Sequence, residues 1–157
     1  MLELFADHHQ VHLFNDGSTA DLGDAWTDRA VLDRLAVAGD AIALGTSVNV
    51  NVAVTVEVLA AAPTADHADF DHVVEGSLRV PSGRLVVMGC TDYEPDAARF
   101  PVPPGEIRVR AAGSNLAEAE RLGVDSDEAP ETMERLSVRV WPASSCDPVV
   151  LKRWSPP

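Results

Sequence analysis

Histidine and carboxylate side chains gather at two places in the sequence, and both types are side chains that bind metal ions. The first group is Asp7, His8, His9 and His12, and the second is His67, Asp69, Asp71 and His72. Imidazole and carboxylate groups are common ligands of zinc and other divalent cations. If the two groups met in the fold, His8, His12, His67 and His72 could hold a metal ion or a small ligand.

The spacing within each group argues against a preformed metal site. On a strand, His8 and His12 share one face and His9 points to the other, so the first group alone cannot supply the three protein ligands of a catalytic zinc site. The second group lacks the spacing of an EF-hand. A metal-dependent enzyme or small-ligand binder is therefore the alternative hypothesis. We favour histidines that bond to backbone or face water, and we predict no cofactor.

The sequence contains no recognisable pattern for nucleophilic catalysis. Cys90 and Cys146 lie far apart and outside any C-x-x-C pair, which predicts two free thiols. No serine lies in a G-x-S-x-G pattern, and no glycine-rich phosphate loop is present. These observations predict a protein that is not an enzyme.

The acidic charge lies mostly in the first half of the chain. The formal net charge is −13, of which residues 1–78 carry −11, with thirteen acidic residues and two arginines, and residues 79–157 carry −2. Such a charge repels nucleic acid and attracts basic proteins. We therefore expect a basic protein partner and no nucleic acid. A general acidity of the source proteome would explain the same composition, since Lys152 is the only lysine.

The longest regular pattern runs from Val48 to Val58. Valine occupies every even position there, and smaller or polar residues occupy the odd ones. Side chains alternate across a strand, so this pattern predicts one face made of valine. Burial of these valines at roughly 1.5–3 kcal/mol each would make this strand the largest single contribution to the core. We expect it to be the central strand of an antiparallel sheet.

The other predicted elements are short strands and one helix. Thr27 is placed to cap a helix near residues 28–36, with Val31, Leu32 and Leu35 on its apolar face and its end near Gly39. Further strands are predicted at residues 2–14 (in one or two pieces), 41–44, 70–80, 85–90, 100–102, 106–112, 135–141 and 149–154, with 70–80 and 85–90 forming a hairpin. This pattern predicts a mainly β protein, with residues 1–157 forming a single antiparallel β-sandwich domain or an open barrel.

A long acidic loop is predicted at residues 113–134, with at most one short helix around residues 116–122. Arg108, Arg110 and Arg139 alternate with apolar residues on the flanking strands, so they should point outward. We expect these arginines to pair with carboxylates of the loop and to hold it down. An anion-binding surface is the alternative interpretation.

The N-terminus and the hydropathy of the chain indicate its location. No positively charged residues precede an apolar run at the N-terminus, so no signal peptide is predicted. No segment approaches the roughly 20 apolar residues that a membrane span needs. We expect a cytoplasmic protein without membrane contact. The last predicted strand, at residues 149–154, could pair with a second copy in a homodimer.

The N-terminal third of the chain resembles the ComJ family. The matching residues are His9-Gln10, Phe14, Trp26-Thr27-Asp28, Ala30 and Ala41-Ile42, with a weaker match at Pro103-Pro104-Gly105-Glu106-Ile107. The resemblance covers roughly residues 9–46 and 100–110. Members of that family are small acidic proteins associated with inhibition of a nuclease of DNA uptake in competent bacteria. The resemblance implies a non-enzymatic inhibitor or immunity-type protein that acts on a basic partner such as a nuclease or toxin.

Carboxylates of the first half are the candidate partner-binding residues. They are Asp16, Asp21, Asp24, Asp28 and Asp33. Such groups would occupy the electropositive groove in which a nuclease binds phosphates, and they would speed association by electrostatic steering. The alternative is a solvated acidic face that binds no partner.

Overall fold

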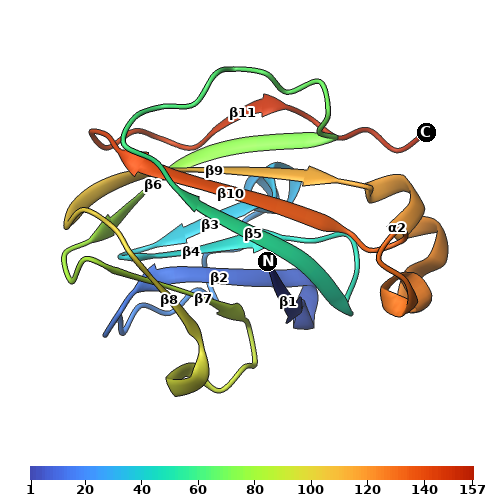
Figure 1. The fold of residues 1–157 in the computed structure, drawn as a ribbon, viewed down its shortest axis with the longest axis horizontal. Coiled ribbons are helices and arrows are strands. Elements are labelled where there is room, and N and C mark those ends of the chain that lie inside the picture. The colour runs from blue at the N-terminus through green and yellow to red at the C-terminus, as the bar shows by residue number, and fades with distance from the viewer.

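Two β-sheets packed face to face form the body of the protein, in a computed structural model that describes all residues from 1 to 157 (Figure 1). In spatial order, the larger sheet contains β1 (Leu2–Phe5), β5 (Asn51–Val58), β10 (Arg135–Pro142), β9 (Gly105–Ser114), β6 (His72–Val80) and β11 (Val149–Lys152). The smaller sheet contains β3 (Leu35–Ala38), β4 (Ala41–Gly45), β2 (Gln10–Asn15), β7 (Arg84–Gly89) and β8 (Ala98–Pro101). The predicted mainly β sandwich is confirmed.

Helices are short and lie outside the two sheets. The α-helices are α1 (Asp28–Asp33) and α2 (Leu116–Leu122), and single 3₁₀ segments cover Asp7–His9, Glu94–Asp96 and Gly123–Glu128. None of these helices is long and apolar enough to cross a membrane.

One apolar cluster of 22 buried residues fills the space between the sheets. Strict alternation produces it: in β2, Val11 and Leu13 point inward and are fully buried, whereas Gln10, His12 and Phe14 point outward and are half-buried. β10 follows the same rule and buries Leu136, Val138 and Val140, as its sequence pattern predicts. The outward face of β2 therefore needs a second cover, and that cover forms the candidate site described below.

The valine-rich strand is shorter and less central than its sequence predicts. β5 begins at Asn51 and is second from the edge of its sheet. It pairs antiparallel with β1 but parallel with β10, so the sheet is mixed rather than purely antiparallel. Val52 and Val54 are fully buried, whereas Val58 is 40% exposed. Val48 lies before the strand but is still buried in the core cluster, and its N–H donates to Glu134 at 3.3 Å.

The predicted helix begins where expected and ends early. Thr27 accepts a hydrogen bond from the backbone N–H of Ala30 (3.1 Å), which is the expected cap. Arg34 then adopts a left-handed conformation (φ 60°) that terminates α1, and the chain continues as β3, which pairs with β4. The prediction that Val31 and Leu32 face the core is wrong, since they are 59% and 65% exposed.

The cap of α1 gives a first testable prediction. Thr27→Ala removes the only side-chain acceptor at the start of this helix, so the free energy of unfolding should fall by about 1 kcal/mol. Urea unfolding would measure the change. Thr27→Ser keeps the hydroxyl, and serine is at least as good an N-cap as threonine, so this variant should be about as stable as wild type. Equal losses in the two variants would contradict the capping role.

The predicted hairpin between residues 70–80 and 85–90 is wrong, although both strands exist. β6 belongs to the larger sheet and β7 to the smaller one, so the turn at Pro81–Gly83 carries the chain from one sheet to the other. The turn after Pro101 does the same between β8 and β9. Both turns close the same end of the sandwich, as the Gly83 carbonyl accepts from the Val102 N–H at 3.0 Å.

The acidic segment 113–134 is held by residues other than those expected. It contains α2 and the 3₁₀ segment Gly123–Glu128, and it packs beyond one end of the sheets (Figure 1). Its anchors are Glu120 and Glu134, which bind Ser47 and Arg34: Glu134 accepts from the Ser47 N–H at 2.8 and 2.9 Å, and Glu120 accepts from the Ser47 hydroxyl at 2.8 Å.

The three outward arginines have other partners than the acidic segment. Glu75 on the neighbouring strand binds both Arg110 (2.6 Å) and Arg108 (3.7 Å). Arg139 pairs with Glu57 at 3.3 Å on the other side of β10. The expectation that these arginines hold the segment down is therefore wrong, because cross-strand carboxylates lie closer to them.

Buried Glu134 gives a second prediction, on pH dependence. Burial raises its pKa from 4.5 to about 7, against the opposing effect of the Ser47 N–H and Arg34. A raised folded-state pKa means that Glu134 stabilises the fold most below pH 4.5, and that this contribution is lost as the pH rises towards 7. The loss should be about 3 kcal/mol over that range. The free energies of unfolding of wild type and Glu134→Gln, compared at pH 4.5 and 7.5, separate the contribution of Glu134 from those of the other titrating groups.

The wild type should lose stability relative to Glu134→Gln as the pH rises. If the difference between the two proteins stayed constant, the hydrogen bonds from the Ser47 and Val48 N–H groups would be offsetting the effect of burial and holding the pKa of Glu134 near its ordinary value of 4.5.

Candidate functional site

A second apolar layer covers the outer face of the smaller sheet. Leu22, Ala30, Ala36, Ala41 and Ala43 form a buried cluster there, with Phe14 and Trp26 packed against it. The cover is the segment of residues 16–27 together with α1, which follows it. The segment packs on small alanines of β3 and β4, and a hollow remains beside the outward side chains of β2.

Hydrogen bonds tie the covering segment down at both ends. Asp40, in the turn between β3 and β4, accepts from Asn15 (3.1 Å) and from the hydroxyl of Ser18. At the other end, the indole N–H of Trp26 donates to Gln10 at 3.1 Å. The hollow between the segment and β2 is therefore a preformed feature of the fold.

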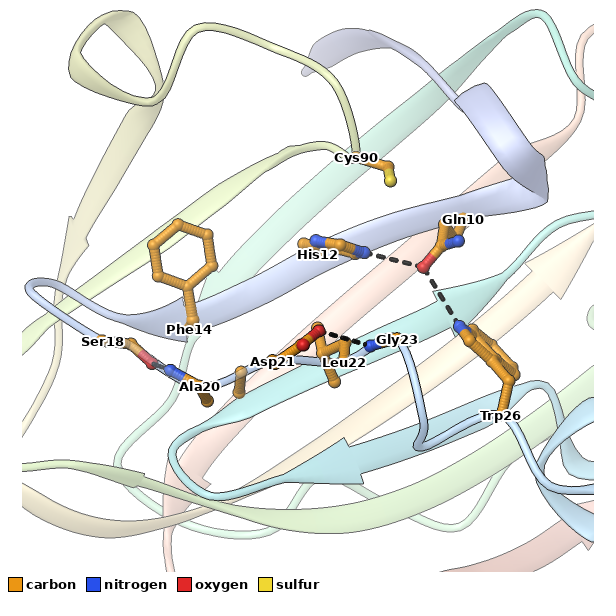
Figure 2. Close-up of a pocket in the computed structure, with 11 residues that line it drawn as sticks. Gln10, His12, Phe14, Ser18, Ala20, Asp21, Leu22, Gly23, Trp26 and Cys90 are labelled. Atoms are coloured by element: carbon orange, nitrogen blue, oxygen red, sulfur yellow. Dashed lines mark hydrogen bonds between the residues drawn. The ribbon is translucent and has the colours of Figure 1, made fainter.

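The hollow is a cleft of about 430 Å³ that opens to solvent. Figure 2 shows Gln10, His12 and Phe14 projecting in a row from β2, with Asp21, Leu22, Gly23 and Trp26 along the covering segment and Cys90 after β7. Ser18, Ala20 and Ala41 complete the lining. A cleft of this volume lies within the range of small-ligand sites.

The hydrogen bonds inside the cleft fix the protonation of His12. Trp26 can only donate, so the Gln10 side-chain atom that faces it must be the carbonyl oxygen. The same oxygen lies 2.7 Å from His12 Nε2, which must therefore carry a hydrogen. Burial lowers the pKa of His12. The neutral ring thus leaves Nδ1 as a hydrogen-bond acceptor with no partner in the protein.

The cleft has acceptors and aromatic surface but no activated nucleophile. Burial, with a contribution from Asp7, raises the pKa of the Cys90 thiol, so the thiolate is disfavoured. No hydrogen bond joins Cys90 to His12. Asp21 is the only carboxylate of the lining, and the lining contains no arginine or lysine. This chemistry suits binding of a positively charged or hydrogen-bond-donating group.

The four histidines of the alternative metal site do not come together. His8 lies in the 3₁₀ segment before β2, His12 lies in the cleft, His67 lies in the loop before β6, and His72 begins β6. No group of three or more metal-binding side chains forms anywhere in the structure. The proposed convergence of His8, His12, His67 and His72 is therefore wrong, because their elements belong to different sheets and different ends of strands.

His72 has a structural role that occupies both ring nitrogens. The backbone N–H of Trp154 donates to Nδ1 at 3.1 Å, so the hydrogen is on Nε2, which donates to the Asp33 carbonyl at 2.8 Å. Burial lowers its pKa, which keeps the ring neutral. His72 thereby joins β6, the end of α1 and the C-terminal segment.

Two of the five candidate partner-binding aspartates are neutralised inside the protein. Asp16 binds Arg84 (2.8 Å) and Arg99 (3.3 Å), and the hydrogen bond from Arg84 lowers its pKa. Asp33 is only 6% exposed and binds Arg29 and Arg153. Burial would raise the pKa of Asp33, but hydrogen bonds from Arg153 and Arg29 outweigh it.

The other three candidate aspartates are exposed and lie close together in the sequence. Asp21 and Asp24 belong to the covering segment, and Asp28 is the first residue of α1. None of the three has an arginine or lysine partner within the protein. Val31 and Leu32 are exposed on the same helix as Asp28. Residues 21–32 thus present free carboxylates beside apolar side chains, and we call this stretch the acidic edge.

Free charge on this protein is almost entirely negative. Ten of the eleven arginines form ion pairs. Arg135 and Lys152 donate to backbone carbonyls. Exposed carboxylates also occur away from the acidic edge, at Asp66 and Asp69 before β6 and at Asp125, Glu128 and Glu131 after α2. Val124 is also exposed beside Asp125, so the acidic edge is distinguished from these groups by the adjoining cleft.

The comparisons with known proteins identify the fold. The structure matches that of ComJ from Bacillus subtilis, an inhibitor of the DNA-degrading activity of NucA, with a TM-score of 0.68 and 16% identity over 90% of this chain and 94% of ComJ. It also matches the crocagin biosynthetic protein J, with a TM-score of 0.60 and 20% identity over 91% of this chain and 96% of that protein. No protein-family model and no curated protein sequence matches the chain. The chain therefore has the ComJ fold over nearly its whole length.

Proposed function

We propose that this protein is a non-enzymatic inhibitor that binds a basic protein partner, such as a nuclease, through the acidic edge. The observation that carries the proposal is the structural likeness to ComJ, which inhibits the DNA-degrading activity of NucA. The ion-pairing pattern adds physical support, since nearly every basic side chain is already paired and the free charges are carboxylates. Such a surface repels DNA and attracts the same basic groups that DNA attracts.

The acidic edge has the composition of a protein-binding surface. Asp21, Asp24 and Asp28 supply negative charge, which steers a basic partner towards the surface and raises the association rate. Val31 and Leu32 lose water when the partner docks, and such apolar burial slows dissociation. In this mechanism the carboxylates take the place of DNA phosphates at the partner and thereby exclude the substrate.

The alternative function, a metal-dependent enzyme, lacks support from the arrangement of side chains. His72 uses both ring nitrogens in structural hydrogen bonds, and His12 is the only one of the four histidines in the main cleft. Cys90 in the same cleft has a raised pKa and no base bonded to it. These features favour a binding protein over a catalyst.

Co-expression with the products of adjacent genes tests the proposed function. We expect a basic protein, with DNA-cleaving activity that is lost in the complex, to co-purify at 50 mM salt and to bind markedly more weakly at 500 mM salt. Salt weakens binding between exposed charges because it screens them. If no adjacent gene product binds, or if binding is insensitive to salt, the proposal fails.

A further inference from the structure

The cleft between β2 and the covering segment has no role in the function proposed above. It adjoins the acidic edge, since Asp21 belongs to both, and Trp26 lies in its wall. A solvent-open cleft beside a docking surface is a place where one side chain of the partner can insert. The chemistry of the lining decides which side chain fits.

Two hydrogen-bond acceptors in the lining of the cleft have no partner within the protein, and they suit a ligand that carries N–H groups. Asp21 uses Oδ1 to accept from the Gly23 N–H at 2.8 Å, and Oδ2 has no partner. His12 keeps Nδ1 free because its Nε2 hydrogen is fixed on Gln10. The oxygen of Gln10 already accepts two hydrogen bonds, so it does not compete for the ligand.

The aromatic rings and the net negative charge of the cleft lining favour a positively charged ligand. Phe14 and Trp26 are half-buried, and they lie at opposite ends of the row in Figure 2, with His12 between them. Ring faces attract cations, most strongly that of tryptophan. Asp21 is the only formal charge of the lining, so an uncompensated negative charge sits at the cleft.

We propose that this cleft receives the guanidinium group of an arginine side chain of the basic partner, held by Asp21 and His12 between the rings of Phe14 and Trp26. This inference rests on the proposed function and names the residue type that the partner contributes. Arginine fits better than lysine, because its planar group stacks on rings and donates several hydrogen bonds in fixed directions. The preformed cleft needs no rearrangement to accept it, which lowers the entropic cost of binding.

A blocked single amino acid tests the cleft without the partner. N-acetyl-arginine amide is titrated into the isotopically labelled full chain, and the indole N–H signal of Trp26 is followed by NMR. We expect this signal and the backbone signals of Gln10 and His12 to shift with a dissociation constant in the millimolar range, while the indole signals of Trp141 and Trp154 stay in place. N-acetyl-citrulline amide has the same shape without the charge and should give no saturable shift.

Matched variants assign the binding to the named residues. Asp21→Asn keeps the acceptor for Gly23 but removes the charge, and it should weaken binding of N-acetyl-arginine amide by roughly tenfold, the effect of one charge-assisted hydrogen bond. Asp24→Asn removes the same charge from the adjoining exposed position, outside the lining, and should change binding less than twofold. Unchanged backbone spectra in both variants exclude a folding defect.

Two results would overturn the inference. One is the absence of any shift of the Trp26 indole signal at 50 mM N-acetyl-arginine amide, and the other is equal binding of the citrulline compound, which would indicate a site for neutral hydrogen-bonding molecules. Neither result bears on the salt-dependent capture of a basic partner described above. If no basic partner were captured but N-acetyl-arginine amide still bound, the cleft would remain a guanidinium site. The proposed inhibitor function would then be rejected.

Discussion

Glu75→Gln is expected to lower the free energy of unfolding by about 3–5 kcal/mol, because it breaks a buried ion pair and leaves one charge without its partner. Glu75 is 6% exposed on β6 and binds Arg110 on β9 at 2.6 Å, with Arg108 at 3.7 Å. Glutamine has the same shape but no charge, so Arg110 would stay buried without a counter-charge. The total stability of a domain is only about 5–15 kcal/mol, so the midpoint of urea unfolding should fall sharply.

The other contacts of Arg110 do not compensate for loss of Glu75. Its guanidinium lies 5.3 Å from the ring centre of Trp141 and donates to the Thr64 carbonyl at 3.0 Å, and both contacts keep it in its buried position. Arg139 lies opposite Arg110 on β10, and its charge adds repulsion once the carboxylate is gone. The arginine therefore cannot simply turn away into solvent.

A matched control separates burial from pairing. Glu57 pairs with Arg139 at 3.3 Å on the same sheet, but its side chain is 53% exposed, so Glu57→Gln should cost less than about 1 kcal/mol. The double variant Glu75→Gln with Arg110→Gln should recover much of the loss, because no uncompensated charge remains. If Glu75→Gln cost no more than Glu57→Gln, the buried pair would not be a stabilising unit.

The sequence predicts the sandwich because alternation is a local signal. β10 shows it most clearly: Leu136, Val138 and Val140 alternate with polar residues, and all three are buried as predicted. β5 shows its limit. The valine pattern locates the strand, but the parallel partner β10 lies about eighty residues further along the chain, and no local pattern specifies it.

The errors arise where tertiary contacts override local preference. Leu35–Ala38 has the composition of a helix end, yet it forms β3 because Arg34 adopts a left-handed conformation and β4 offers a strand edge. A left-handed arginine has no sequence signal, unlike a glycine at a helix end. The turn at Pro81–Gly83 is equally compatible with a hairpin and with a crossing between sheets, since the strands on both sides are apolar.

The candidate site could be predicted only in part. The sequence identified Asp21, Asp24 and Asp28, which are exposed, but it could not show that Asp16 and Asp33 are neutralised, because their partners Arg84 and Arg153 lie 68 and 120 residues away. The cleft is not predicted in the sequence analysis. Its signal was present in the alternation of β2, which turns Gln10, His12 and Phe14 outward from the core and so requires a cover.

The triple variant Asp21→Asn, Asp24→Asn and Asp28→Asn is expected to lower the association rate with the basic partner by about 10- to 100-fold at 50 mM salt. Steering depends on the charge near the docking surface, so the loss should shrink to a few-fold at 500 mM salt, where screening acts on both proteins. Asparagine keeps the local hydrogen bond that Asp21 makes to Gly23, and the fold should stay intact.

A second triple variant distinguishes steering by the acidic edge from the effect of net charge. Asp125→Asn, Glu128→Gln and Glu131→Gln remove the same formal charge from exposed positions after α2. Stopped-flow or surface-binding measurements should show that this variant associates within a few-fold of wild type, because those positions follow α2 and lie outside residues 21–32. Equal losses in the two triple variants would mean that the partner responds to overall acidity. The acidic edge would then have no special part in recognition, and the exposed Val31 and Leu32 would need another explanation.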